Sequence, residues 1–84
     1  MPGYTLHPQV GLRAERFGAL AYHYGNRRLT FLNDDLLVAT VNSDALRDDV
    51  DEALVDAGVP EPQRAAYKLA LARLADAEVL VARD

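Results

Sequence analysis

Alternating apolar and polar positions mark the first third of the chain. The alternation over 10–15 has a period of two, which predicts a first strand. A second strand is predicted over about 19–24 and a third over 28–32, with a turn at 15–18 between the first two. Gly25-Asn26 suits the second turn because both residues tolerate positive φ. These segments predict a three-stranded antiparallel meander.

The third strand raises the question of what covers it. Leu29 and Phe31 share one face of the strand, and for that face we expect a place in the core. A meander of three strands leaves its first and last strands at the edges, with unpaired backbone groups that proteins either protect or use. An extended peptide can pair with such an edge as a fourth strand. The missing neighbour could therefore belong to another molecule.

Helical periodicity replaces the alternation after residue 33. Asn33-Asp34-Asp35 can cap a short helix that ends near Val41, and Ser43 can cap a second helix over 44–57. Pro60 and Pro62 bracket the start of a third helix over about 61–77. The second helix carries an apolar stripe of Leu46, Val50, Ala53, Leu54 and Ala57. Segment 1–9 is expected to be extended, and segment 79–81 to be a short strand or an extended tail.

Length, charge and composition limit the classes of function that the chain can have. We expect the 84 residues to form one α+β domain over 1–84. The absence of cysteine excludes disulfides and thiolate chemistry. Residues 1–33 carry a net charge of +3 and residues 34–84 a net charge of −7. Such an acidic chain repels nucleic acid, although its basic strand region could attract an acidic segment. We find no signal peptide and no apolar run of membrane-spanning length, so we expect a cytoplasmic protein.

Catalytic and metal-binding patterns are missing from the sequence. The two histidines have no ligand pattern around them, and no nucleophile stands in a recognisable motif. We therefore expect no enzyme, no metal and no cofactor.

One stretch resembles a known family. "LHPQVGLRAERFGALAYHYGNRRLTFLN" (6–33) is similar to the N-terminal half of the mycofactocin biosynthesis peptide chaperones, which are related to the PqqD-like peptide-recognition modules. The similar residues are Arg13-x-Glu15-x-Phe17-Gly18-Ala19-Leu20-x-Tyr22, a polar turn, the strand Arg28 to Leu32, and Asn33. The helical half matches in its layout.

The resemblance implies a winged-helix-like fold without catalytic activity. Members of the family bind the leader of a ribosomally made precursor peptide. They present it to a radical S-adenosylmethionine (SAM) maturase, which carries the iron–sulfur clusters, and the product is a peptide-derived redox cofactor. In related modules the leader lies as an added strand along the third strand, in a groove closed by the third helix.

Candidate peptide-binding residues follow by position and by geometry. The positions that match the family's third strand are Arg28, Leu29, Thr30, Phe31 and Leu32. On the third helix, spacings of three and four residues put two cations and two apolar groups on one flank. This flank, which would suit an acidic, amphipathic leader, consists of Arg64, Lys68, Leu71 and Ala72.

Two other classes of function remain open. A winged-helix DNA-binding regulator has a related layout, but its recognition helix should be basic, whereas the second helix here is acidic. A small homodimeric interaction domain could pair its own edge strands.

Overall fold

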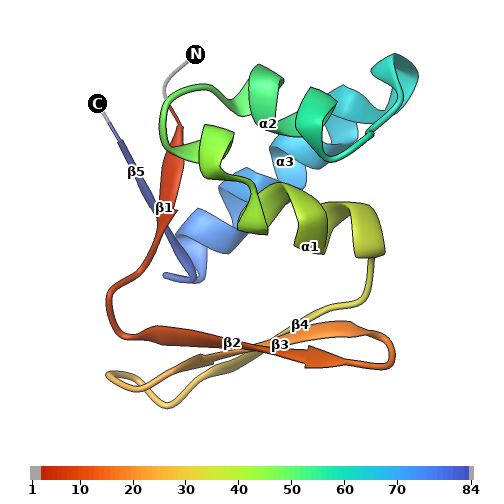
Figure 1. Cartoon of the computed structure of the whole chain (residues 1–84). Coiled ribbons are helices and arrows are strands. Elements are labelled where there is room, and N and C mark those ends of the chain that lie inside the picture. The colour runs from red at the N-terminus through yellow and green to blue at the C-terminus, as the bar shows by residue number, and fades with distance from the viewer. Residues whose placement is uncertain (1–2, 84) are drawn as a thin grey trace.

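The computed structural model describes residues 3–83 and places a three-stranded sheet beneath a layer of helices (Figure 1). The strands are β1 (Tyr4–Leu6), β2 (Val10–Glu15), β3 (Gly18–His23), β4 (Leu29–Leu32) and β5 (Leu80–Ala82). The helices are α1 (Asp35–Asn42), α2 (Val50–Asp56) and α3 (Arg64–Asp76), with the 3-10 turns η1 (Asp44–Arg47) and η2 (Glu61–Gln63). The predicted α+β class, with a meander followed by three helices, is confirmed.

The sheet has the order β2-β3-β4, and both pairs are antiparallel. Its inner face, toward the helices, has two alanines in β3, Ala19 and Ala21, which are buried together with Val10 and Leu32. Small side chains at the centre of this face leave room for α1, which contacts β3 and β4. The inner face therefore completes the core.

The β3–β4 turn differs from the sequence prediction. Positive φ falls on Arg27 (φ 61°), not on Gly25 or Asn26. The Nδ1 atom of buried His23 accepts hydrogen bonds from the backbone N–H groups of Gly25 (3.0 Å) and Asn26 (3.1 Å). The Asn26 side chain in turn accepts from the N–H of Arg28. Because side chains satisfy these amides, the strained position can lie at the end of the turn.

The second predicted helix is divided into η1 and α2. The chain leaves the helical conformation at Asp49, which is extended (φ −154°, ψ 115°) and whose carboxylate accepts from the N–H groups of Asp51 and Glu52. This cap starts a new helix, because a short acidic side chain satisfies amides that would otherwise be free. The predicted stripe is nevertheless confirmed as core: Leu46, Val50, Ala53 and Leu54 are buried, and Ala57 packs against them.

The two ends of the described chain form a second small sheet. β1 and β5 are antiparallel, with Tyr4 opposite Ala82 and Leu6 opposite Leu80. Of the segment predicted to be extended, residues 4–6 form a strand, and residues 1–2 lie outside the described residues. Of the two forms predicted for 79–81, the structure has the short strand rather than the extended tail. In residues 3–83 no helix is long and apolar enough to cross a membrane, and no cluster of three or more potential metal ligands occurs.

The expected core position of Leu29 and Phe31 is wrong. Leu29 is 51% exposed and Phe31 is 64% exposed. The register places them opposite Tyr22 and Leu20, on the outer face of the sheet, while the helices cover the other face. Of the β4 side chains, Leu32 is the one that enters the core.

Candidate functional site

Strand β4 has a free edge. It pairs with β3 on one side, and within residues 3–83 no strand pairs with its other side. An edge of this kind presents a row of N–H and C=O groups to any extended segment that approaches it.

The hydrogen-bond pattern identifies the free backbone groups of this edge. His23 donates its N–H to the carbonyl of Arg28 across β3 and β4, whereas Tyr24 donates to Gln9 on the opposite side of β3. In an antiparallel ladder, successive residues alternate between the two sides of their strand. Thr30 therefore faces β3, and the N–H and C=O groups of Leu29 and Phe31 point outward from the sheet.

A hollow lies where the chain leaves β4. It has a volume of about 190 Å³ and is lined by Asp34, Leu37, Ala66, Tyr67 and Ala70. Asp34 caps α1, because its Oδ1 accepts from the N–H groups of Leu36 (2.9 Å) and Leu37 (3.2 Å). The other carboxylate oxygen accepts from the hydroxyl of Tyr67 at 2.6 Å, which fastens α3 to the end of β4.

Protonation states support this contact. The hydrogen bond from Tyr67, assisted by the backbone N–H groups of Leu37 and Leu36, holds the pKa of Asp34 below its ordinary value despite partial burial. The same hydrogen bond and partial burial raise the pKa of Tyr67 above its ordinary value. The charged carboxylate and the neutral phenol are therefore the stable pair at neutral pH.

The four residues predicted on α3 lie elsewhere. Lys68 forms an ion pair with Asp51 of α2 (2.6 Å), and its hydrogen bond lowers the pKa of that carboxyl group. Arg64 donates to the carbonyl of Val59 at 3.1 Å in the α2–α3 connection. Leu71 is fully buried and Ala72 is half-buried. The structure thus turns both cations toward α2 and its connection.

A different flank of α3 meets the chain after β4. Ala66 and Ala70 follow Arg64 and Lys68 by two residues each, which places them about 200° around the helix. Together with Tyr67 they line the hollow beside Asp34. The hydrogen bond between Tyr67 and Asp34, which caps a helix, identifies this flank. The two residues lie far apart in the sequence, so the sequence alone does not reveal their contact.

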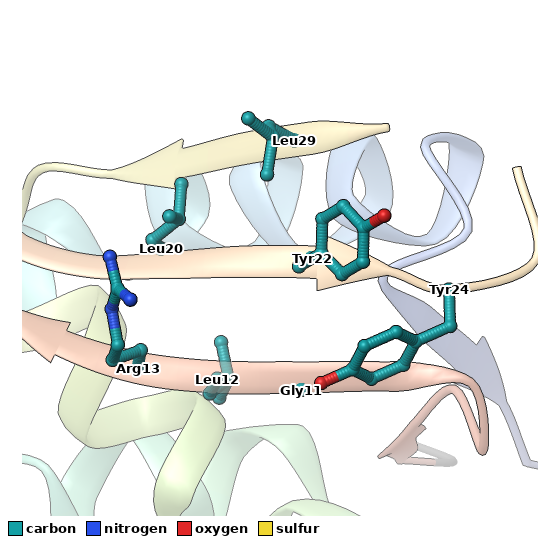
Figure 2. A pocket seen from close by; sticks show the side chains of 7 residues that line it. All are labelled: Gly11, Leu12, Arg13, Leu20, Tyr22, Tyr24 and Leu29. Carbon is teal, nitrogen blue, oxygen red and sulfur yellow. The ribbon is translucent and has the colours of Figure 1, made fainter. Parts of the chain in front are cut away.

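The outer face of the sheet forms a second feature. A hollow of about 360 Å³ lies on this face. Figure 2 shows the residues that line it, which come from all three strands and from the position after β3. They are Gly11, Leu12, Arg13, Leu20, Tyr22, Tyr24 and Leu29. Of the residues around this hollow, Leu29 alone was selected from the sequence as a candidate site residue. The sequence of β3, the second predicted strand, indicated this face. Large apolar groups alternate there with small ones, so that both faces of the strand are apolar.

Comparisons with known proteins identify the family of the chain. The model of the peptide chaperone MftB family matches residues 3–81. The chain belongs to this family. It is 44% identical over 82 residues to peptide chaperone MftB of Mycobacterium ulcerans, covering 98% of this chain and 75% of the relative. It is 46% identical over 78 residues to peptide chaperone MftB of Mycolicibacterium smegmatis, covering 93% of this chain and 76% of the relative.

Family membership settles part of the expected function. A peptide chaperone role is non-catalytic, so the expectation that the chain is not an enzyme is confirmed. No solved structure matches the chain.

Proposed function

We propose that this MftB family member binds the leader of a ribosomally made precursor peptide by strand addition to β4. It then presents the peptide to a radical SAM maturase in the cytoplasmic biosynthesis of mycofactocin, a peptide-derived redox cofactor. The observation that carries the proposal is the free edge of β4, at which the backbone groups of Leu29 and Phe31 point outward. Membership of the peptide chaperone family supports a peptide as the ligand. The resemblance in residues 6–33 supports the maturase as the enzyme partner and mycofactocin biosynthesis as the pathway.

An added strand would have two different environments. Side chains on one face would lie beside Leu29 and Phe31 on the outer face of the sheet. Side chains on the other face would point toward the inner layer, where the hollow between α1 and α3 is lined by Ala66 and Ala70. An alternating, partly apolar leader fits both environments, because strand residues point to opposite faces in turn.

The proposed contacts differ between the strand and the helix. Residues Arg28 to Leu32 remain the proposed binding strand, with Thr30 and Leu32 contributing to register through their pairing with β3. On α3 we propose the flank of Ala66, Tyr67 and Ala70, since Arg64 and Lys68 contact other groups and Leu71 is buried in the core.

A DNA-binding function is not favoured by the charges of the helices. The exposed residues of α2 include Asp51, Glu52 and Asp56. Such a helix would repel phosphates rather than contact them.

Proline at an edge position tests strand addition. Phe31→Pro removes an outward N–H and puts a ring at the edge, which edge strands tolerate. Phe31→Ala removes the same aromatic ring but keeps the N–H. We expect Phe31→Pro to weaken precursor binding at least about tenfold relative to Phe31→Ala, because hydrogen bonds and close approach of the added strand are both lost.

A matched control is available at the opposite edge of the sheet. Ala14 in β2 is exposed, and the ladder alternation points its N–H away from β3. Ala14→Pro should leave the precursor affinity within about twofold of wild type. Equal affinities of the Phe31→Pro and Phe31→Ala variants, measured by calorimetry on folded proteins, would contradict strand addition at β4.

A further inference from the structure

The outer face of the sheet exposes an unusual concentration of large apolar side chains. Tyr24 is 65% exposed and packs against Tyr22, which lies opposite Leu29 on this face. Phe31, also on this face, packs against half-exposed Phe17 in the β2–β3 turn. Scattered exposed apolar residues are ordinary, but a contiguous group of them marks an interaction surface.

This outer face is held in shape by its own packing. The Tyr22 and Tyr24 rings meet edge to face with centroids 4.9 Å apart, and the Phe17 and Phe31 rings lie 5.5 Å apart. Gly11 leaves room for Tyr24: a Cβ atom at this position would lie 3.2 Å from the Tyr24 hydroxyl. Aromatic side chains that are fixed before binding lose little conformational entropy and are frequent centres of binding energy.

The leader peptide would leave most of this face uncovered. A strand added to β4 would lie about 4.8 Å beyond it and therefore about 14 Å from β2. Gly11 and Arg13 belong to β2, and Tyr24 follows β3. This part of the face would therefore be available to a different partner.

The charges around the face indicate the chemistry of that occupant. Arg13 lies in β2, Arg16 in the β2–β3 turn, and Arg27 and Arg28 between β3 and β4, and all four are exposed. In residues 1–33 the sequence has one acid, Glu15, which is paired with Arg13 at 2.7 Å. A second copy docked face to face would bring two arginine-rich sheets together, whereas an acidic partner would complement them.

We propose that the outer face of the sheet, centred on Tyr24 with Arg13 at its margin, docks a folded protein partner whose apolar contact residues are surrounded by carboxylates. This proposal rests on the proposed function for the identity of the partner, which is the maturase. The same small domain would then hold the peptide at the edge of its sheet and the enzyme on the outer face of that sheet. The two ligands would be adjacent, the peptide at the β4 edge beside Leu29 and Phe31 and the enzyme over Tyr24 and Arg13.

The experiment measures binding of the purified maturase and of the precursor peptide to the same chaperone variants. Tyr24→Ala and Arg13→Glu change the outer face away from β4. Val55→Ala and Arg47→Glu are matched controls, since both residues are exposed on the helical part of the molecule. Amide spectra establish that every variant is folded.

We expect Tyr24→Ala and Arg13→Glu each to weaken maturase binding at least about tenfold, which is the range of a central interface residue. The controls should stay within about twofold, and precursor affinity should stay within about twofold for all four variants. Unchanged maturase binding by Tyr24→Ala, or an equal loss in the controls, would overturn the proposal. So would a loss of precursor affinity in Tyr24→Ala, which would mean that the peptide covers this face.

Two further outcomes separate this proposal from the proposed function. If sedimentation shows a wild-type dimer that Tyr24→Ala abolishes, a second copy occupies the face and the proposal is overturned. If the maturase does not bind the wild-type chain, both this proposal and the assigned enzyme partner are overturned. Precursor binding, measured in the same samples, tests strand addition separately.

Discussion

Replacing Tyr67 with phenylalanine removes one hydroxyl and leaves the ring that packs against the core. The lost contact is the 2.6 Å hydrogen bond to the Asp34 carboxylate, which joins α3 to the cap of α1 at the end of β4. Hydrogen bonds to charged groups contribute about 1.5–3 kcal/mol, and partial exposure of both residues favours the lower value. We therefore expect Tyr67→Phe to lower the free energy of unfolding by about 1.5 kcal/mol at pH 7.

This loss should be measurable by thermal and urea unfolding. For a chain of 84 residues the unfolding entropy near 60 °C is about 0.18 kcal/mol/K, so the same change lowers Tm by about 8 °C. Tyr24→Phe is the matched control, because it removes an exposed hydroxyl and should change stability by less than about 0.5 kcal/mol.

The pH dependence follows from the two pKa shifts. The folded-state pKa of Asp34 is lowered, so its contribution is present above the ordinary Asp pKa and is lost as pH falls through the lowered value. The folded-state pKa of Tyr67 is raised, so its contribution is present below the ordinary Tyr pKa and is lost as pH rises through the raised value. The stability difference between wild type and Tyr67→Phe should be constant from about pH 5 to pH 9 and shrink outside that range.

A double-mutant cycle provides the refutation. Asp34→Asn keeps a good helix cap but removes the charge that accepts the hydrogen bond. If the effect of Tyr67→Phe is the same in the wild-type and Asp34→Asn backgrounds, the two side chains are not coupled and the reasoning fails.

Two further substitutions test the packing that positions β4. Gly18 has φ +139°, and a Cβ atom there would collide with the carbonyl of Leu32, so Gly18→Ala should unfold more readily than Gly58→Ala, which has φ +83° and open space. Denaturation midpoints compare the two, and equal midpoints would show that the collision is relieved without cost. Leu54→Ala opens a cavity at a fully buried position and should cost about 2.7–5 kcal/mol in urea unfolding, whereas Val55→Ala, at an exposed neighbour, should cost less than about 1 kcal/mol. Similar losses at both positions would contradict the assigned helix face.

Local patterns predicted much of the fold. Alternation located β2, β3 and β4, and the apolar stripe of the second helical segment proved to be core. Both were predictable because the periodicity of strands and helices appears in the spacing of apolar residues along the sequence. The break at Asp49 was missed, since a run of aspartates shows many candidate caps without indicating which one is used.

Less of the candidate site could be predicted from the sequence. The face of Leu29 and Phe31 depends on which side of the sheet the helices cover, and alternation alone does not decide this. The rotation of α3 is likewise set by tertiary packing, in which Leu71 and Leu74 are buried. The spacing of its residues therefore identified a flank without revealing what that flank contacts. The edge position of β4, in contrast, follows from the order of the strands and was predicted.

Amide hydrogen exchange in β4 tests strand addition most directly. In the free chain, the alternation predicts slow exchange at Thr30, whose N–H faces β3, and fast exchange at Leu29 and Phe31. Saturating precursor peptide should slow amide exchange at Leu29 and Phe31 at least about tenfold and leave the relative exchange rates of the other residues unchanged. A precursor without its leader should have no effect. Bound precursor with Leu29 and Phe31 still exchanging at their free rates would contradict the account.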